Sequence, residues 1–107
     1  MHEPSWNFSR QPTSGIDRPE GLGDIHFELT IEECVLPYLS RDNAKILKRL
    51  ILDAIESRGE PVSGRISVGD EFIAVERQAD RIVIEGAKKW SFSLGEAEKL
   101  WLKIRST

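Results

Sequence analysis

Cys34 and His26 are the two side chains in this 107-residue chain best suited to act together as a nucleophile and a general base. A thiol becomes a strong nucleophile when a neighbouring imidazole removes its proton, so the two groups would have to meet. They could meet if the chain after residues 24–31 folded back over that stretch. A small buried thiol and an imidazole on a strand face account for both residues without catalysis. We therefore predict no catalytic residue and no enzymatic activity.

Two further motifs begin in the sequence but are not completed. The His-Glu pair at residues 2–3 starts a zinc-protease pattern, yet Trp6 stands where the second histidine belongs. The Gly-Leu-Gly run at residues 21–23 starts a dinucleotide-binding pattern, yet His26 stands at the third glycine position. The two histidines and the single cysteine lie in segments that need not converge. We therefore predict no cofactor and no metal site.

The elements that would position any binding site centre on residues 63–94, where apolar and polar side chains alternate. Turn residues interrupt this stretch at 68–71, 77–80 and 85–88, and Gly and Asp there accept the positive φ of tight hairpins. The pattern predicts a four-strand antiparallel meander over Gly64–Ser93. If the first two loops hold two residues each, six β-branched side chains share the core face of this sheet. They are Ile66, Val68, Ile73, Val75, Ile82 and Ile84.

The last hairpin of the meander can form in two registers. A two-residue loop places Trp90 and Phe92 on the open face beside Phe72, where aromatic and cationic side chains could stack bases and hold phosphates. A three-residue loop places both aromatic residues in the core and turns Lys89 outward. We prefer the three-residue loop because it separates apolar from polar residues better.

The open face of the meander and two isolated leucines are the candidate interaction surfaces. The candidate binding face consists of Arg65, Phe72, Arg81, Val83 and Lys89. Leu52 and Leu102 lie outside the apolar stripes of the two predicted helices and are candidate dimer contacts.

Three further elements are predicted around the meander. Asp24–Ile31 alternates cleanly and predicts a fifth strand. Thr30 and Glu33 have the spacing of a capping box, which predicts a short helical turn that Pro37 ends.

A helix is predicted from Ser40 or Asp42 to Arg58, with Gly59 as its left-handed terminator. Its apolar stripe consists of Ala44, Ile46, Leu47, Leu50, Ile51, Ala54 and Ile55. The charged residues on its other side are typical of a solvated face. Ser93 and Glu96 form a second capping-box pattern, which opens a closing helix. Its inward stripe consists of Ala97, Leu100, Trp101 and Ile104.

Together these elements predict a two-layer α+β fold, with an antiparallel sheet of about five strands and two helices packed on one face. Residues 24–107 form the single α+β domain. Residues 1–23 hold three of the five prolines and three of the eight glycines without apolar periodicity, which predicts a flexible tail. Trp6 and Phe8 within that tail either dock on a partner or have no role.

Charge and cysteine content limit the class of protein. The net charge is −3, and residues 1–41 hold seven acidic and three basic side chains, so the acidity is concentrated early. A nearly neutral body lacks the broad positive field of general nucleic-acid binders, although a local strip of cations could suffice. The single cysteine suits a reducing compartment, so we predict the cytoplasm. No apolar run approaches the ~20 residues that span a bilayer, and we predict no membrane partner.

The order of the predicted elements resembles that of the single-stranded-DNA-binding transcription coactivators, in which a curved meander is backed by a helix. The resemblance covers about Gly64 to Ile104, including the helix start Ser-Leu-Gly-Glu at residues 93–96. It implies nucleic-acid binding on the open face. The acidic surplus and the additional amino-terminal strand and helix depart from that pattern. A second similarity, to winged-helix proteins over residues 51–63 and the next hairpin, lacks a recognition helix.

These observations favour a non-catalytic interaction module, of the regulatory, adaptor or neutralising kind. It would bind another protein or itself through apolar surface that one helical layer leaves uncovered. A single-stranded nucleic-acid-binding protein is the alternative.

Overall fold

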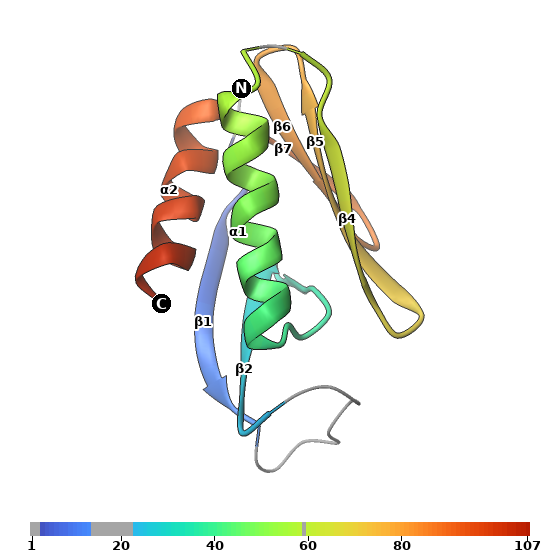
Figure 1. The fold of residues 1–107 in the computed structure, drawn as a ribbon, viewed down its shortest axis with the longest axis vertical. Coiled ribbons are helices and arrows are strands. Elements are labelled where there is room, and N and C mark those ends of the chain that lie inside the picture. The colour runs from blue at the N-terminus through green and yellow to red at the C-terminus, as the bar shows by residue number, and fades with distance from the viewer. Residues whose placement is uncertain (1–2, 14–22, 59) are drawn as a thin grey trace.

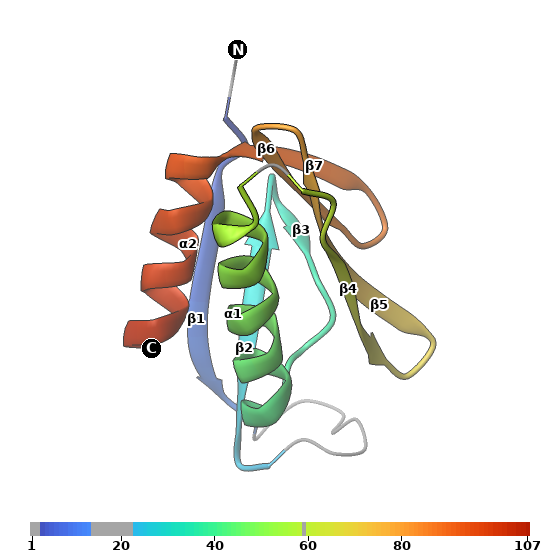
Figure 2. The ribbon, with the colours of Figure 1, turned by 45° about the horizontal axis from the view of Figure 1, so that its top comes forward.

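Two antiparallel sheets pack against the same pair of helices (Figures 1 and 2). The computed structural model describes residues 3–13, 23–58 and 60–107. In chain order, the elements are β1 (Trp6–Pro12), β2 (Ile25–Ile31), β3 (Cys34–Val35), α1 (Arg41–Glu56), β4 (Ser63–Val68), β5 (Glu71–Gln78), β6 (Arg81–Glu85), β7 (Lys89–Ser93) and α2 (Leu94–Ser106). Strands β1, β2 and β3 form the three-stranded sheet, and β4 to β7 form the four-stranded sheet. The α+β class is therefore confirmed.

The four-stranded sheet is the predicted meander, with the predicted register. Val68 pairs with Glu71 and Gln78 pairs with Arg81, so both of these loops contain two residues. Gly69 takes the positive φ of 62° that the first loop requires. The last loop contains three residues, since Glu85 pairs with Lys89. Trp90 and Phe92 consequently point into the core and are buried, as the preferred register predicts.

The prediction of one five-strand sheet is wrong, because β2 pairs with β1 and not with the meander. The flexible-tail prediction for residues 1–23 is correspondingly wrong for Trp6–Pro12, which form β1. Phe8 pairs with Leu29 and is fully buried. The alternation in β1 is hard to recognise because only Trp6 and Phe8 are strongly apolar, and the exposed Arg10 follows them on the same face. Residues 1–2 and 14–22 of the predicted tail lie outside the described residues.

The predicted helical turn at Thr30–Glu33 is also wrong. Glu32 and Glu33 form a two-residue hairpin turn, closed by the pairing of Ile31 with Cys34. Both glutamates have positive φ, at 50° and 69°. This conformation costs a non-glycine residue energy, and the pairing of β3 along β2 offsets that cost. The capping-box pattern therefore indicated a turn correctly but gave the wrong kind of turn.

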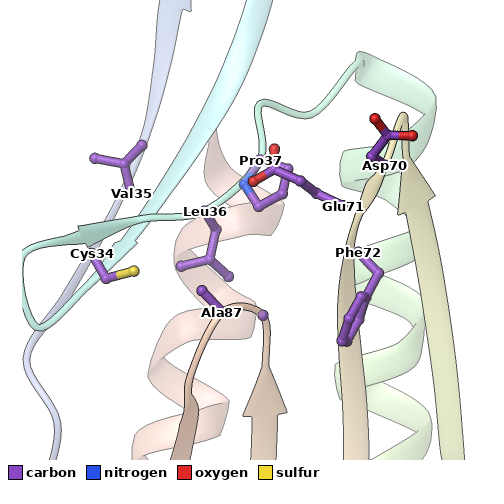
Figure 3. A pocket seen from close by; sticks show the side chains of 9 residues that line it. Cys34, Val35, Leu36, Pro37, Asp70, Glu71, Phe72 and Ala87 are labelled. Atoms are coloured by element: carbon purple, nitrogen blue, oxygen red, sulfur yellow. The ribbon is translucent and has the colours of Figure 1, made fainter.

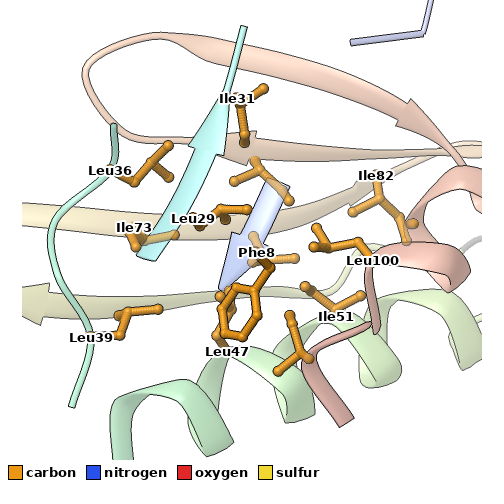
Figure 4. Packing of buried hydrophobic residues seen from close by; sticks show 14 of the residues in the cluster. Phe8, Leu29, Ile31, Leu36, Leu39, Leu47, Ile51, Ile73, Ile82 and Leu100 are labelled. Atoms are coloured by element: carbon orange, nitrogen blue, oxygen red, sulfur yellow. The ribbon is translucent and has the colours of Figure 1, made fainter. Parts of the chain in front are cut away.

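Helix α1 packs against both sheets, so the helices do not lie on one face of a single sheet as predicted. It contacts β2 of the three-stranded sheet, three strands of the four-stranded sheet, and α2. Helix α2 likewise contacts β1, β6 and β7. Figure 4 shows side chains from both sheets and both helices meeting in one cluster, which includes Phe8, Leu29, Leu47, Ile73 and Leu100. The rings of Phe8 and Phe27 stack with centroids 5.8 Å apart.

The predicted helix starts are confirmed. The Ser40 hydroxyl accepts a hydrogen bond from the Asn43 backbone N–H at 3.1 Å, and Ser93 does the same for Glu96 at 3.2 Å. The predicted terminator Gly59 lies outside the described residues. Ile46, which we assigned to the core stripe of α1, is 46% exposed, and this assignment is wrong. It lies at the margin of the stripe, beyond the width that the two sheets cover.

Arg77, in β5 of the four-stranded sheet, caps the carboxyl end of α1. Its side chain is buried, and Nη1 donates to the carbonyl oxygens of Ala54 at 2.8 Å and Ile55 at 3.2 Å. These are among the last carbonyls of the helix, which have no partner within the helix itself. The positive charge also opposes the negative end of the helix dipole. A residue that lies in a strand thus supplies the cationic cap that the last turn of α1 lacks.

We expect Phe8→Ala to lower the free energy of unfolding by about 3–5 kcal/mol, because it removes a fully buried ring from the common core. Urea denaturation measures this change. The neighbouring exposed substitution Asn7→Ala is the control and should stay within about 0.5 kcal/mol of the unsubstituted chain. Equal stability of Phe8→Ala and the unsubstituted chain would contradict the position of β1.

We expect Arg77→Met to destabilise the fold by about 1.5–3 kcal/mol, because two helix carbonyls lose a charged donor while the length of the side chain is nearly kept. The same urea experiment measures it. Lys89→Met removes an exposed cation from β7 and should have little effect. A similarly small effect of Arg77→Met would show that the cap does not stabilise α1.

Candidate functional site

The predicted binding face lies on the outer surface of the four-stranded sheet, away from the helices. Arg65 and Phe72 form a pair there, with the guanidinium carbon 4.2 Å from the ring centroid. Lys89 is exposed. Val83 is only 9% exposed. The face therefore offers one aromatic ring, already covered by a cation, and little free apolar area.

Arg81 is engaged by groups of this chain. Its Nη2 donates to the Glu3 carboxylate at 3.0 Å, and its Nε donates to the Ser91 hydroxyl at 2.6 Å. Glu3 also accepts the backbone N–H of Ser93, the N-cap residue of α2, at 2.7 Å. The side chain and the backbone N–H of Ser93, together with Arg81, hold the pKa of the Glu3 carboxyl below its ordinary value. Glu3 therefore links the segment before β1 to the first residues of α2.

Cys34 and His26 lie on opposite faces of the three-stranded sheet. Cys34 pairs with Ile31, whose side chain is in the core, whereas His26 alternates to the outer face. His26 is buried there, with its ring 4.5 Å from that of Tyr38 and Nδ1 at 3.4 Å from the Thr13 hydroxyl. The arrangement does not bring the thiol and the imidazole together. A nucleophile with its base is therefore not assembled at these residues.

A shallow cavity of about 230 Å³ lies beside Cys34, where β3 approaches the loops of the four-stranded sheet (Figure 3). Asp70, Glu71 and Phe72 line it from β5 and the preceding turn, and Leu36 packs against Gly86. The described residues include no group of three or more His, Cys, Asp and Glu side chains that could hold a metal ion. The cavity is lined mainly by apolar atoms.

Strand β4 is an edge strand, and no described residue pairs with its outer side. Arg77 donates its backbone N–H to the carbonyl of Val62 at 2.8 Å. Because partners alternate along an antiparallel ladder, Gly64, Ile66 and Val68 direct their main-chain groups toward β5. Ser63, Arg65 and Ser67 consequently direct theirs away from the sheet, and all three residues are exposed. The main-chain groups of these three residues are thus available to a further strand.

The other sheet edges are covered or short over the described part of the chain. The outward main chain of β1 includes Phe8, which is fully buried, and Pro12, which has no N–H. At the edge of β7, Glu3 accepts the N–H of Ser93. Strand β3 contains two residues. The edge of β4 is therefore the surface best prepared for strand pairing.

An apolar shoulder of α1 flanks the β4 edge. Leu50 lies against β4 so closely that a Cβ at Gly64 would overlap its side chain. Ile46, one turn earlier on the same side of the helix, is exposed. A strand added to β4 would place its inward side chains over this shoulder. We refer to the main chain of Ser63, Arg65 and Ser67 together with Ile46 and Leu50 as the β4 site.

The β4 site contains one residue of the predicted binding face, Arg65, and none of the predicted dimer contacts. Leu102 is 45% exposed on α2, and Leu52 is half-buried on α1. Sequence reasoning missed Ile46 because it was counted in the core stripe. It missed the free edge because the strand at residues 24–31 was expected to join the meander. The polar outer residues Ser63, Arg65 and Ser67 were the available signal for an edge strand.

Comparisons of this chain with protein-family models, with curated proteins and with solved structures find no match. Within the described residues, neither helix is long and apolar enough to cross a membrane. The candidate site therefore depends on the geometry of this chain alone.

We expect Glu3→Gln to lower Tm at pH 7, because it weakens the acceptor for Arg81 and Ser93. The folded chain lowers the pKa of Glu3 from 4.5, so ionised Glu3 stabilises the fold above pH 4.5. That contribution is lost as the pH falls from 4.5 through the lowered pKa. Thermal melts over this range should therefore show the two chains converging in acid.

The control for this pH series is Glu98→Gln, which removes the same charge from an exposed position of α2. Its Tm should nearly match that of the unsubstituted chain at pH 7. A difference between Glu3→Gln and the unsubstituted chain that grows in acid would contradict the assigned role of Glu3.

Proposed function

We propose that this chain is a non-catalytic protein-binding module that accepts an extended segment of a partner protein as a fifth strand beside β4. The observation that supports the proposal is the free edge of β4 next to the exposed side chain of Ile46. Strand addition of this kind takes its affinity from main-chain hydrogen bonds and its specificity from alternate side chains.

The surroundings of β4 favour a partner segment of particular chemistry. Its outward side chains would lie beside Ser63, Arg65 and Ser67, where an acidic residue opposite Arg65 is favourable. Its inward side chains would lie over Ile46 and Leu50, where apolar residues lose contact with water. The preferred segment therefore alternates acidic or polar residues with apolar ones.

A second copy of this chain is a less suitable partner at the same edge. In the antiparallel register that pairs residues 63–67 of one copy with residues 63–67 of the other, Arg65 of one copy lies opposite Arg65 of the other. Like charges directly opposite one another destabilise a strand pair. Binding another protein is therefore favoured over self-association through β4.

The nucleic-acid alternative has less support than strand addition. Base stacking needs exposed aromatic side chains, whereas Trp90 and Phe92 are buried and Phe72 already pairs with Arg65. The charge of Arg81 is opposed by Glu3. Salt-sensitive binding of mixed-sequence oligonucleotides that is lost in Arg65→Ala would favour this alternative instead.

Selection of extended peptides from a random library on the full chain tests the proposal. We expect the enriched peptides to alternate acidic and apolar residues, and to slow hydrogen exchange of the Arg65 and Ser67 amides on binding. Arg65→Pro should abolish binding but preserve the fold, because the N–H it removes faces away from β5. Binding that survives Arg65→Pro would overturn the proposal.

Two matched controls accompany this experiment. Arg10→Pro makes the same change on the outward edge of β1 and should leave peptide binding unchanged. Ile46→Ser should weaken binding about tenfold through the lost apolar contact, whereas Leu102→Ser, at an equally exposed position of α2, should not. Equal losses in Ile46→Ser and Leu102→Ser would place the binding surface elsewhere.

A further inference from the structure

A second cleft, of about 210 Å³, lies between the first turns of α1 and the last turn of α2. Figure 1 shows that these two helix ends lie next to each other, because the helices run side by side in opposite directions. The residues around the cleft are of two kinds, apolar on the floor and cationic at the rim. They are Phe27, Ala44 and Ile104 on the floor, Arg41, Lys45, Lys48 and Arg105 at the rim, and Thr107 at the end.

The rim is cationic throughout. Arg41, Lys45 and Lys48 follow one another at helical spacing along the α2 side of α1, and Arg105 faces them from α2. None of the lining side chains is acidic, and within the described part of the chain no carboxylate forms an ion pair with any of these four cationic side chains. Their mutual repulsion favours occupation by an anion.

Two features affect the cleft, one by orienting a cation and the other by raising the local positive electrostatic potential. The guanidinium of Arg105 lies 5.5 Å from the centroid of the Trp101 ring, a cation–π distance that orients it along α2. The cleft also lies at the amino-terminal end of α1, where the helix dipole adds positive potential. The carboxyl end of α2 adds the opposite sign, which Lys103 and Arg105 in its last turn offset.

The floor of the cleft is apolar. Phe27, Ala44 and Ile104 are each buried, yet their remaining surface lines the cleft. An apolar cavity of about 150 Å³ is large enough to bind benzene. The cleft can therefore hold one ring or a short acyl chain, with its charged group among the cations at the rim.

We propose that this cleft binds a small organic anion, with a carboxylate or phosphate group held by Arg41, Lys45, Lys48 and Arg105, and an apolar body on Phe27, Ala44 and Ile104. The site is separate from the β4 site, because Lys45 and Lys48 face α2 whereas Ile46 and Leu50 face β4. The proposal does not depend on strand binding.

The test is a titration of the full chain with phenyl phosphate, hexanoate and inorganic phosphate. NMR amide chemical shifts report the binding. We expect saturable shifts at Ala44, Lys48 and Ile104 with one or both organic anions, and binding of inorganic phosphate that is about tenfold weaker because it has no apolar part. The stronger of the two organic anions indicates which combination of charged group and apolar body the cleft prefers. If neither organic anion causes saturable shifts at millimolar concentrations, the proposal is overturned.

The double substitution Lys45→Gln and Lys48→Gln should weaken binding of the organic anions about tenfold. Its matched control is Lys88→Gln with Lys89→Gln, which removes the same charge from exposed residues of the last hairpin and should leave binding unchanged. Equal losses in the two double variants would show a response to net charge only, and inorganic phosphate binding as tightly as the organic anions would rule out a role for the floor. Either result would overturn the proposal.

Discussion

Burial of two sheets against one helix is the constraint on which the rest of this structure depends. Each sheet has a single apolar face, and α1 contacts both of them along its buried stripe of Ala44, Leu47, Ile51 and Ala54. Two of these four residues are alanines, which let the strands approach the helix axis. Gly64 does the same from the side of β4, where a Cβ would overlap the present position of the Leu50 side chain. The ends of α1 are accordingly held from outside the helix, by Ser40 at its start and Arg77 at its finish.

The candidate surfaces follow from the same constraint. A helix that packs against two sheets keeps only its two flanks and its outer side for other contacts. One flank meets β4 and carries the apolar pair Ile46 and Leu50, and the other meets α2 and carries Lys45 and Lys48. The two flanks thus have different chemistry, one apolar beside a free strand edge and the other cationic over an apolar floor. One rigid element positions both candidate sites relative to the core.

The sequence allowed the meander and the helix starts to be predicted, because both depend on local signals. Alternation over residues 63–94 fixes which side chains share a face, and Ser40 and Ser93 cap the helices through nearest neighbours. The three-stranded sheet was missed because β1 has only two strongly apolar residues and pairs across a long connection. The turn at Glu32 and Glu33 uses positive φ without glycine, so no turn residue marks it. The free edge of β4 depends on how other strands pair, which no local pattern determines.

The contacts between the two ends of the chain also affect the order in which the protein can fold during synthesis. Trp6 donates its indole N–H to the Glu96 carboxylate at 2.9 Å, and Glu3 binds the N–H of Ser93. Contacts of such long sequence separation form late and slow folding, because the intervening loop must close first. Until the residues of α2 have emerged from the ribosome, Phe8 and the inner face of β1 lack the residues that bury them in the folded protein. Chaperones that recognise exposed aromatic segments would therefore find their target at the amino-terminal end of the unfinished chain.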